Sequence, residues 1–288
     1  MSQHVIQARP LSNGDLEALL QEDWLHEAEH MYLLHSVFLA LGQIKDEPEG
    51  FQGEFYGAFS EEGLEGLLFL RAGYSFVLGK SSERAGLSFA PILLASSVPP
   101  RLGIGPSAGM SGLVPRLAKN MKIRFDRSQP FMEIRRGMPP GPGLGVGVVL
   151  RQACMQDVEW LVRANLVLNH EDLQFDPRYI HMEKLRERIQ KRVERRETWV
   201  LERAGKPVSK LDIGFENLAG ALIEGVFTDP KWRGRGFGTR LVSSLCSLLL
   251  KRVERVGLHL ARENSAARRA YEAAGLHEVA DLRLVLFN

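Results

Sequence analysis

Residues 226–239 have the sequence VFTDPKWRGRGFGT, which leads from an apolar segment through a glycine-rich turn into a long amphipathic segment. Three glycines alternate with larger residues in this turn, and glycine keeps side chains away from the backbone. Successive N–H groups can therefore converge on an anion at the start of a helix, where the helix dipole also favours negative charge. Two arginines beside the glycines add positive charge. The segment predicts a phosphate site formed by Arg233, Gly234, Arg235, Gly236 and Gly238.

Three known kinds of phosphate-binding loop can be compared with this turn. A Walker loop ends in Gly-Lys-Ser or Gly-Lys-Thr, and no Lys-Ser or Lys-Thr follows these glycines. A dinucleotide-binding loop has the spacing G-x-G-x-x-G early in a βαβ unit, whereas this turn has G-x-G-x-G after three consecutive predicted strands. The spacing that remains is R-x-x-G-x-G, formed by Arg233, Gly236 and Gly238.

Around the turn, hydrophobic periodicity predicts alternating strands and helices. Before the turn, we expect strands at 148–153, 198–202, 208–215 and 221–228 and helices at 157–170 and 182–197. After it, we expect a helix at 238–256, a strand at 258–261, a helix from Asn264 to Gly275 and two strands within 276–287. The second half of the chain is therefore predicted to be an α/β domain with a mixed sheet of six or seven strands.

Two segments in this order resemble the markers of the GNAT superfamily of acyl-CoA-dependent N-acyltransferases. The first is the R-x-x-G-x-G turn and the second is NSAARRAYEAAG at 264–275, so the resemblance extends from about Val148 to the C-terminus. It implies a GNAT-type mixed central sheet with flanking helices, and acetyl-CoA as co-substrate. In the family the turn binds the CoA pyrophosphate, the preceding strand pairs with pantetheine, and the late helix presents a tyrosine to the CoA sulfur. The resemblance assigns cofactor binding to Val226, Phe227, Thr228, Arg233, Gly234, Arg235, Gly236, Phe237, Gly238, Thr239 and Asn264.

Transfer of an acetyl group to an amine needs a neutral amine and a proton donor for the departing thiolate. The resemblance places Tyr271 as that donor, and a packing role is the alternative for this tyrosine. Glu224 is the one charged residue in 221–228, so we predict that it helps to deprotonate the amine. Strand alternation would put it on one face with Leu222, Val226 and Thr228. A solvent-facing edge glutamate is the alternative, and Glu216 and Asp212 are the next candidates for the base.

The predicted reaction is direct transfer of an acetyl group from acetyl-CoA to a primary amine, because no Cys or Ser is placed as a nucleophile. The histidines at 170, 181, 259 and 277 show no metal-ligand spacing, so no metal site is predicted. His259 lies on a predicted strand and is a further candidate for proton relay. The alternative function is a non-catalytic acyl-CoA-binding sensor or interaction module, which would bind the same cofactor without turnover.

A break in the chain lies at 137–147, where eight of eleven residues are Gly or Pro. This composition predicts a linker between an N-terminal domain at 1–136 and the catalytic domain at 148–288. In the first half we expect helices at 33–41 and 110–120, strands at 54–59, 64–71 and 75–78, and a long Gly/Pro-rich loop at 96–112.

The first half carries a resemblance of its own. The segments IGPSAGMSGL at 104–113 and QPFM at 129–132 resemble an N-terminal domain that precedes the acetyltransferase domain in some bacterial GNAT proteins. That domain is regarded as a degenerate copy of the same fold, so we expect a second, GNAT-like α/β domain. The segment 101–105 lacks the R-x-x-G-x-G spacing, and Pro106 interrupts the start of the next helix. One coenzyme site is therefore predicted for the chain.

The 288 residues include 37 Lys and Arg against 35 Asp and Glu, a net charge of +2 that disfavours nucleic acid and anionic membranes as partners. The charge is −3 in 1–150 and +5 in 151–288, so the second half favours an anion. In 178–206, ten Lys and Arg are mixed with five acids, which favours a solvated helix face over a surface for RNA or an acidic acceptor. The two cysteines form no disulfide framework, no signal-peptide pattern is visible, and no apolar run approaches about 18 residues. We expect a cytoplasmic protein whose partner is an amine-bearing small molecule or protein.

Overall fold

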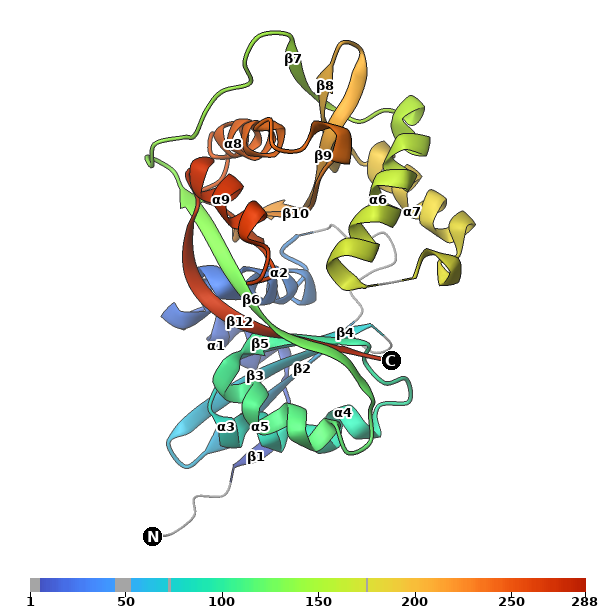
Figure 1. Cartoon of the computed structure of the whole chain (residues 1–288). Coiled ribbons are helices and arrows are strands. Elements are labelled where there is room, and N and C mark those ends of the chain that lie inside the picture. Colours follow the sequence, from blue (N-terminus) through green and yellow to red (C-terminus); the bar gives the residue numbers. More distant parts are fainter. Residues whose placement is uncertain (1–5, 45–52, 72–73, 175) are drawn as a thin grey trace. The chain divides into compact units, whose positions relative to one another are not determined.

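The computed structural model describes residues 6–44, 53–71, 74–174 and 176–288 (Figure 1). The chain divides into two compact units. The N-terminal unit contains Met1–Phe131 together with Val279–Asn288, and the C-terminal unit contains Met132–Glu278. These units differ from the predicted division at 137–147, because the boundary falls inside a strand and the last residues of the chain join the N-terminal unit.

The N-terminal unit is an α/β structure whose strands follow the order β1-β2-β3-β4-β5-β12. Its strands are β1 (Gln7–Pro10), β2 (Glu54–Ser60), β3 (Gly63–Arg71), β4 (Ser75–Ser81), β5 (Leu102–Pro106) and most of β12 (His277–Phe287). Its helices are α1 (Asn13–Leu19), η1 (Asp23–His26), η2 (Ala28–His30), α2 (Met31–Ala40), α3 (Glu83–Ser88), α4 (Ala90–Ala95) and α5 (Ser107–Leu117). Strands β4 and β5 are parallel, and the other described pairs are antiparallel. Every helix and strand predicted for this half is present.

The predicted loop at 96–112 is wrong, because this segment contains β5 and the first half of α5. Its glycines permit close packing rather than flexibility. A Cβ on Gly103 would lie 2.1 Å from Cζ of Phe76, and a Cβ on Gly112 would lie 1.9 Å from the carbonyl oxygen of Glu83. Since there is no space for these side chains, glycine is required inside a strand and a helix.

The C-terminal strand completes the core of the N-terminal unit. It pairs with β5 in antiparallel register, with Leu282 opposite Pro106. Val285 and Phe287 are buried in the same hydrophobic cluster as Phe76, whose ring centre lies 6.4 Å from that of Phe287. Because this apolar strand is buried in the N-terminal unit, the unit is built from both ends of the chain.

The C-terminal unit also has a mixed sheet, with the strand order β11-β10-β9-β8-β7. Strand β6 (Ile123–Arg135) follows β11 in this order, and its residues from Met132 onward belong to this unit. Its other strands are β7 (Val148–Gln152), β8 (Thr198–Arg203), β9 (Lys206–Asn217), β10 (Gly220–Thr228) and β11 (Arg255–His259). Its helices are η3 (Met155–Asp157), α6 (Val158–Leu173), η4 (Pro177–Tyr179), α7 (Met182–Glu194), η5 (Pro230–Trp232), α8 (Phe237–Leu249) and α9 (Ser265–Ala273). Strands β10 and β11 are parallel, and the pairs from β7 to β10 are antiparallel. The predicted α/β architecture is therefore present.

Two predictions about the end of the chain are wrong. The helix predicted at 238–256 ends at Leu249, and β11 begins at Arg255. The Arg136 side chain donates to the carbonyl oxygens of Leu250 and Val253, both at 3.0 Å, and so binds carbonyls that a longer helix would use internally. The segment 276–287 forms one strand instead of two, because it contains no Gly, Pro or Asn that would favour a turn.

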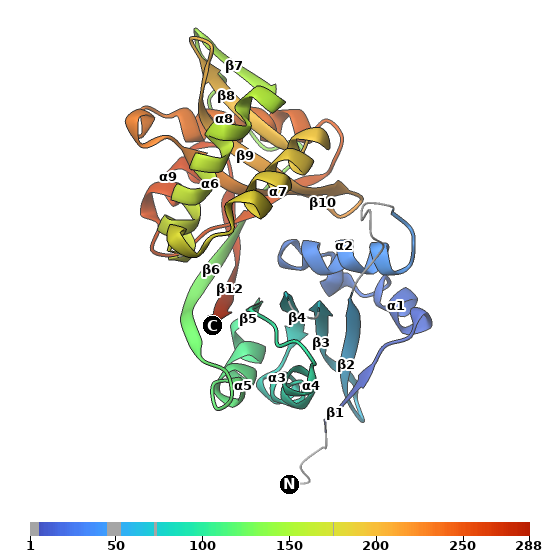
Figure 2. The ribbon, with the colours of Figure 1, turned by 90° about the vertical axis from the view of Figure 1, so that its right-hand side faces the viewer.

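Two hydrophobic clusters fix the helices on opposite sides of the C-terminal sheet. The larger cluster joins α8 and α9 to the sheet, and a smaller one joins α6 and α7 to Val200 of β8. Figure 2 looks onto α6 and α7 in front of the sheet, with α8 and α9 behind it. Across the described ranges, none of the helices combines the length and the apolar run needed to cross a membrane.

The Gly/Pro-rich segment 137–147 forms no helix or strand, as its composition predicts, but it is held against the C-terminal unit. The N–H of Gly141 donates to the carbonyl oxygen of Ala274 at 3.2 Å, and Arg240 donates to that of Gly143 at 2.7 Å. A Cβ on Gly141 would lie 2.4 Å from the Ala273 carbonyl oxygen, so glycine permits this close approach. The segment is therefore packed along α8 and α9 and is part of the C-terminal unit.

Candidate functional site

The glycine-rich turn between β10 and α8 is open. Gly234 and Gly236 have left-handed backbone angles, with φ of 73° and 76°, which glycine adopts without strain. Nothing lies within 4 Å of the place where either Cβ would stand. Helix α8 starts at Phe237, so the N–H groups of its first turn, which includes Gly238 and Thr239, have no partner inside the helix. The turn can therefore accept an anion on backbone N–H groups.

An aromatic pair flanks this turn in the sequence and packs together. The ring of Trp232 meets the ring of Phe237 edge-on, with the centres 5.6 Å apart. The guanidinium groups of Arg235 and Arg203 lie 5.0 Å and 5.2 Å from the centre of the Trp232 ring. Because Phe237 is buried, only its backbone can face an anion, whereas the charge of Arg235 is held close to the turn.

Arg233 has protein partners of its own. Its guanidinium donates to the carbonyl oxygen of Thr228 at 3.0 Å and to the two carboxylate oxygens of Glu171 at 3.0 and 2.8 Å. The two side chains are 44% and 43% exposed, so this ion pair contributes at most about 1 kcal/mol. A phosphate group could replace Glu171 as the partner at little cost. Glu171 lies near the end of α6 and was not among the residues predicted from the sequence.

Strand β10 has an open edge at its carboxyl end. Its parallel pairing with β11 covers Ala221 to Ile223, opposite Val256 to Leu258, and the described pairs end there. The strand itself continues through Val226 and Phe227 to Thr228. The backbone of this last part of β10 is therefore available on the side of β11, directly before the glycine-rich turn.

A β-bulge at Gly225 changes the faces of β10. Gly225 has a φ of 59°, and between Glu224 and Phe227 strand β10 has one more residue than β9. The predicted face shared by Glu224 and Val226 is therefore wrong. Val226 packs against the larger hydrophobic cluster, which joins α8 and α9 to the sheet. Phe227 packs on the opposite face of the sheet, with its ring centre 6.2 Å from that of Trp160 in α6. Glu224 consequently faces α6 and α7, together with Phe227.

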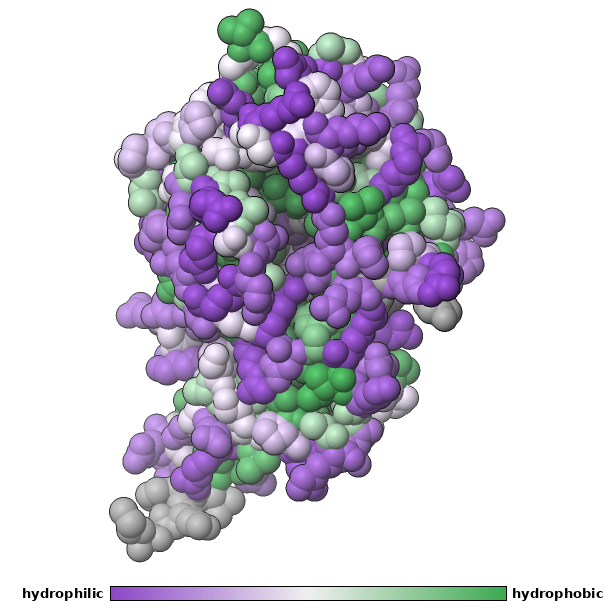
Figure 3. Space-filling view, viewed as in Figure 1, coloured by the Kyte–Doolittle hydropathy of each residue, from purple (hydrophilic) through white to green (hydrophobic). Residues whose placement is uncertain are grey.

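A cavity of about 290 Å³ lies on this face, between α6, α7 and the strands β8 to β10. Its wall combines apolar residues and amides with five charged side chains: Asp172, Arg188, Arg192, Asp212 and Glu224. In the space-filling view, hydrophilic residues cover most of the visible face, and apolar residues reach the surface at the position of α6 (Figure 3). The cavity therefore offers apolar contacts, amides and charges of both signs on this face of the sheet.

A network of charges forms the floor of the cavity. Lys210 is fully buried, and its Nζ lies 2.7 Å from a carboxylate oxygen of Asp212. The hydroxyl of Thr198 donates to the other oxygen of Asp212 at 2.7 Å. Arg192 of α7 bridges Asp212, at 3.1 Å, and Glu224, to which its Nη2 donates. Burial alone would raise the pKa of Asp212, but the charges of Lys210 and Arg192 outweigh burial and lower it.

Tyr271 lies on α9 and is 7% exposed. Burial raises the pKa of its phenol well above the ordinary value, and the negative charge of Asp172 in the cavity wall raises it further. The phenol is therefore protonated at neutral pH. Asn264 is the N-cap of α9, where its Oδ1 accepts from the N–H of Ala267 at 3.0 Å.

The other predicted acid–base candidates lie in different surroundings. The carboxylate of Glu216 accepts from Arg252 at 2.6 and 2.9 Å and does not line the cavity described here. Asp212 lines the cavity but is bound by Lys210. Burial lowers the pKa of His259 to about 4, so its imidazole is neutral at physiological pH.

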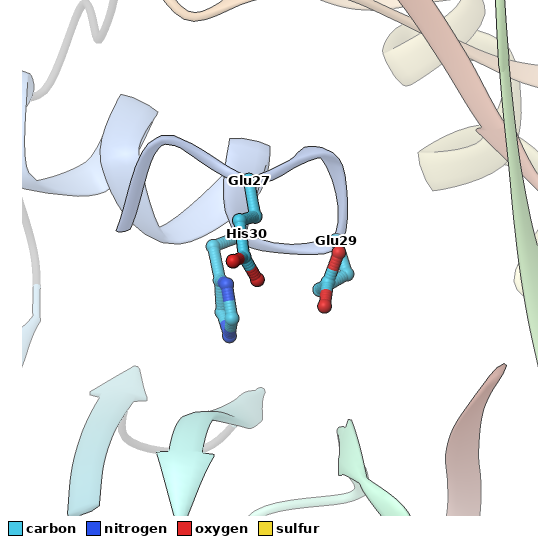
Figure 4. A group of neighbouring side chains, drawn as sticks. All are labelled: Glu27, Glu29 and His30. Atoms are coloured by element: carbon cyan, nitrogen blue, oxygen red, sulfur yellow. The ribbon is translucent and has the colours of Figure 1, made fainter. Parts of the chain in front are cut away.

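In the described part of the chain, one group of side chains is close enough to share a metal ion, and it belongs to the N-terminal unit. The ligand atoms of Glu27, Glu29 and His30 lie within 4.8 Å of one another (Figure 4). Burial lowers the pKa of His30, whereas the negative charge of Glu27 raises it by more than the positive charge of Lys80 lowers it. None of the three residues lines the cavity of the C-terminal unit.

A known family matches a large part of the C-terminal unit. Residues 164–276 match the model of the family described as the acetyltransferase (GNAT) family, and this stretch includes the open turn, Glu224 and Tyr271. The chain therefore contains a GNAT acetyltransferase domain. No curated protein is significantly similar in sequence to the chain.

Solved structures share the fold over nearly the whole chain. A Drosophila protein has a TM-score of 0.66 at 14% identity, with 98% of each chain covered. A GCN5-related N-acetyltransferase from Sphaerobacter thermophilus has a TM-score of 0.59 at 18% identity, covering 97% of this chain and 94% of that one. A tandem GNAT protein from the clavulanic acid biosynthesis pathway has a TM-score of 0.52 at 16% identity, with 98% of each chain covered. The fold of the chain is therefore consistent with two GNAT-like units.

Proposed function

We propose that the chain is an N-acetyltransferase that moves the acetyl group of acetyl-CoA directly to a primary amine. The observation that carries this proposal is the position of the open turn. It stands at the start of α8, directly after the free edge of β10, and the same strand carries Glu224 into a cavity of about 290 Å³. A cofactor bound to turn and edge would end beside a cavity that can hold the amine.

For the cofactor, we assign the pyrophosphate to the backbone N–H groups between Gly234 and Thr239, with the positive charge of Arg235 nearby and Arg233 released from Glu171. The open backbones at Gly234 and Gly236, where nothing lies within 4 Å of a Cβ position, fit this role. We assign pantetheine to the edge from Val226 to Thr228 and to Asn264, whose amide N–H₂ remains available while its oxygen caps α9.

For the reaction, the thioester supplies an electrophilic carbonyl carbon. The amine nitrogen forms the new C–N bond, and the C–S bond breaks. Tyr271 gives its phenolic proton to the departing sulfur, and Glu224 accepts the proton that the amine loses, directly or through water. A cysteine nucleophile in the core is disfavoured, because burial raises the pKa of Cys246 to about 12.

We place this reaction in the cytoplasm. Both cysteines are free, as is usual for proteins of a reducing compartment.

Glu224→Gln tests the assigned base. We expect thiol release from acetyl-CoA to fall most below the pKa of the acceptor amine, near about 10.4 for an alkylamine, and to recover partly above it, where free amine needs no base. The measurement is the pH profile of kcat/KM for one responsive amine. Glu216→Gln is the matched control, because Glu216 is held by Arg252 outside the cavity and should keep the wild-type profile. A wild-type profile for Glu224→Gln would place the base elsewhere, and the absence of turnover with every amine would instead favour an acyl-CoA sensor.

A further inference from the structure

The cavity that faces the proposed acetyl-transfer site carries a specific arrangement of charges. The formal charge of its lining is close to balanced: three carboxylates face two guanidinium groups, and the buried Lys210 lies beside Asp212. A cavity built for a polyamine would be lined by carboxylates without arginines, because like charges repel at short range. The lining instead suits a molecule that carries charges of both signs.

The two arginines of the cavity differ in their ion-pair partners. Arg192 is engaged by Asp212 and Glu224 and is 30% exposed. Arg188 lies one turn earlier on α7 and also lines the cavity, but its side chain is exposed and has no ion-pair partner among the residues that the structure describes. Residues four apart on a helix lie on one face, so Arg188 presents its charge beside Arg192. Arg188 is therefore available to bind an anionic group.

The carboxylates of the cavity lie where an ammonium group could bind. Glu224 stands at the bulge of β10, on the strand that leads to the open turn. Asp172 stands on α6 and lines the same cavity. An amine held near these carboxylates would leave an anion on the same molecule to extend toward α7, where Arg188 lies.

We infer that the acceptor is a small amino acid-like molecule, whose primary amine binds near Asp172 and Glu224 and whose carboxylate or similar anion binds Arg188. This inference rests on the proposed acetyltransferase function. A guanidinium can donate two parallel hydrogen bonds to a carboxylate, which gives direction as well as affinity. The cavity of about 290 Å³ is suited to a molecule of this size and leaves Arg188 as the residue that selects it.

The test compares matched acceptors with the full-length protein. Thiol release from acetyl-CoA is measured with glycine, β-alanine and γ-aminobutyrate, each beside its carboxamide, and with spermidine. We expect kcat/KM to be at least tenfold higher for the best carboxylate than for its amide, and higher than for spermidine. The amide has the less basic amine, so more of it is in the reactive form, and the comparison is biased against the inference.

Arg188→Gln then locates the selectivity. It is expected to raise KM for the preferred carboxylate at least tenfold and to leave KM for the amide and the affinity for acetyl-CoA unchanged. Lys191→Gln is the matched control, because Lys191 is an exposed cation on the same helix that does not line the cavity. Equal or better turnover of the amides or of spermidine, or an equal loss for both acceptors in Arg188→Gln, would overturn the inference while the proposed function stands. If acetyl-CoA binds but no amine in either set is acetylated, the inferred acceptor class is wrong, and the absence of thiol release with further primary amines would overturn the proposed function as well.

Discussion

Tyr271→Phe is expected to lower kcat by about 100-fold while the affinity for acetyl-CoA stays unchanged. The substitution removes the phenolic hydroxyl and keeps the ring, which packs in the core below α9. A general acid of this kind contributes roughly 10²- to 10⁴-fold. Because burial and the charge of Asp172 raise the pKa of Tyr271, the phenol remains protonated throughout the neutral range, so the expected loss in Tyr271→Phe should not depend on pH there. The measurement is single-turnover thiol release with a saturating amine, beside calorimetry of acetyl-CoA binding.

Tyr56→Phe is the control for this substitution. The hydroxyl of Tyr56 donates to Glu54 at 2.6 Å in the N-terminal unit, so its removal tests loss of a tyrosine hydroxyl away from the site. We expect wild-type kcat for Tyr56→Phe. Full activity of Tyr271→Phe, with the chemical step rate-limiting, would show that another group protonates the sulfur.

Asp212→Asn is expected to reduce the free energy of unfolding by about 3–5 kcal/mol, the usual cost of removing one partner of a buried ion pair. The change keeps the shape of the side chain but leaves Lys210, which is 0% exposed, without its closest negative charge. It also removes a partner of Arg192 in the floor of the cavity. Urea unfolding followed by circular dichroism measures the difference.

The difference in stability between the wild type and Asp212→Asn is predicted to depend on pH. The pKa of Asp212 is lower in the folded protein than its ordinary value, so the carboxylate stabilises the fold fully above about pH 4 and loses this effect as the pH falls further. The gap between wild type and Asp212→Asn should therefore shrink below about pH 4. Glu216→Gln breaks an exposed ion pair and should change stability by less than about 1 kcal/mol. Equal effects of the two substitutions would show that the ion pair of Lys210 and Asp212 contributes no more than an exposed one.

Much of the C-terminal unit could be predicted from the sequence because its signals are local. The glycine spacing at 234–238 indicates an open turn, and Asn264 and Gly275 mark the ends of the following helix. The helix that was predicted too long at 238–256 shows the limit of such signals. Its apolar periodicity continues past Leu249, and the interaction that accompanies its end is made by Arg136, which lies far away in the sequence.

The floor of the cavity could not be predicted, because it depends on contacts between distant residues. In the sequence, Arg192 is one of many basic residues of a helix predicted to be solvated. Its contacts with Asp212 and Glu224 form only in the folded chain. The bulge at Gly225 has a sequence signal, an isolated glycine within a strand pattern, and that signal could have corrected the predicted face of β10. Lys210, a lysine inside an apolar strand, was a further signal of a buried pair.

In the N-terminal half, composition predicts a loop where the structure has a strand and a helix. Glycines at 103 and 112 indicate a loop by composition, yet they lie in β5 and α5 because neighbouring atoms fill the space of a side chain. The membership of 279–288 in this unit also needs the fold, since sequence order alone assigns these residues to the preceding domain. We propose that this unit is a degenerate GNAT-like copy that binds no coenzyme.

Calorimetric titration of the intact chain shows whether the turn at the start of α8 binds acetyl-CoA. We predict one acetyl-CoA per chain for the wild type and an affinity at least tenfold lower, about 1.4 kcal/mol, for Gly236→Glu, which puts a carboxylate where phosphate should meet N–H groups. Gly137→Glu is the control, because Gly137 also has a positive φ, of 87°, and open space around its Cβ position but lies outside the turn. Unchanged affinity in a folded Gly236→Glu protein would show that acetyl-CoA binds elsewhere, and two equivalent sites in the wild type would show that the N-terminal unit binds it too.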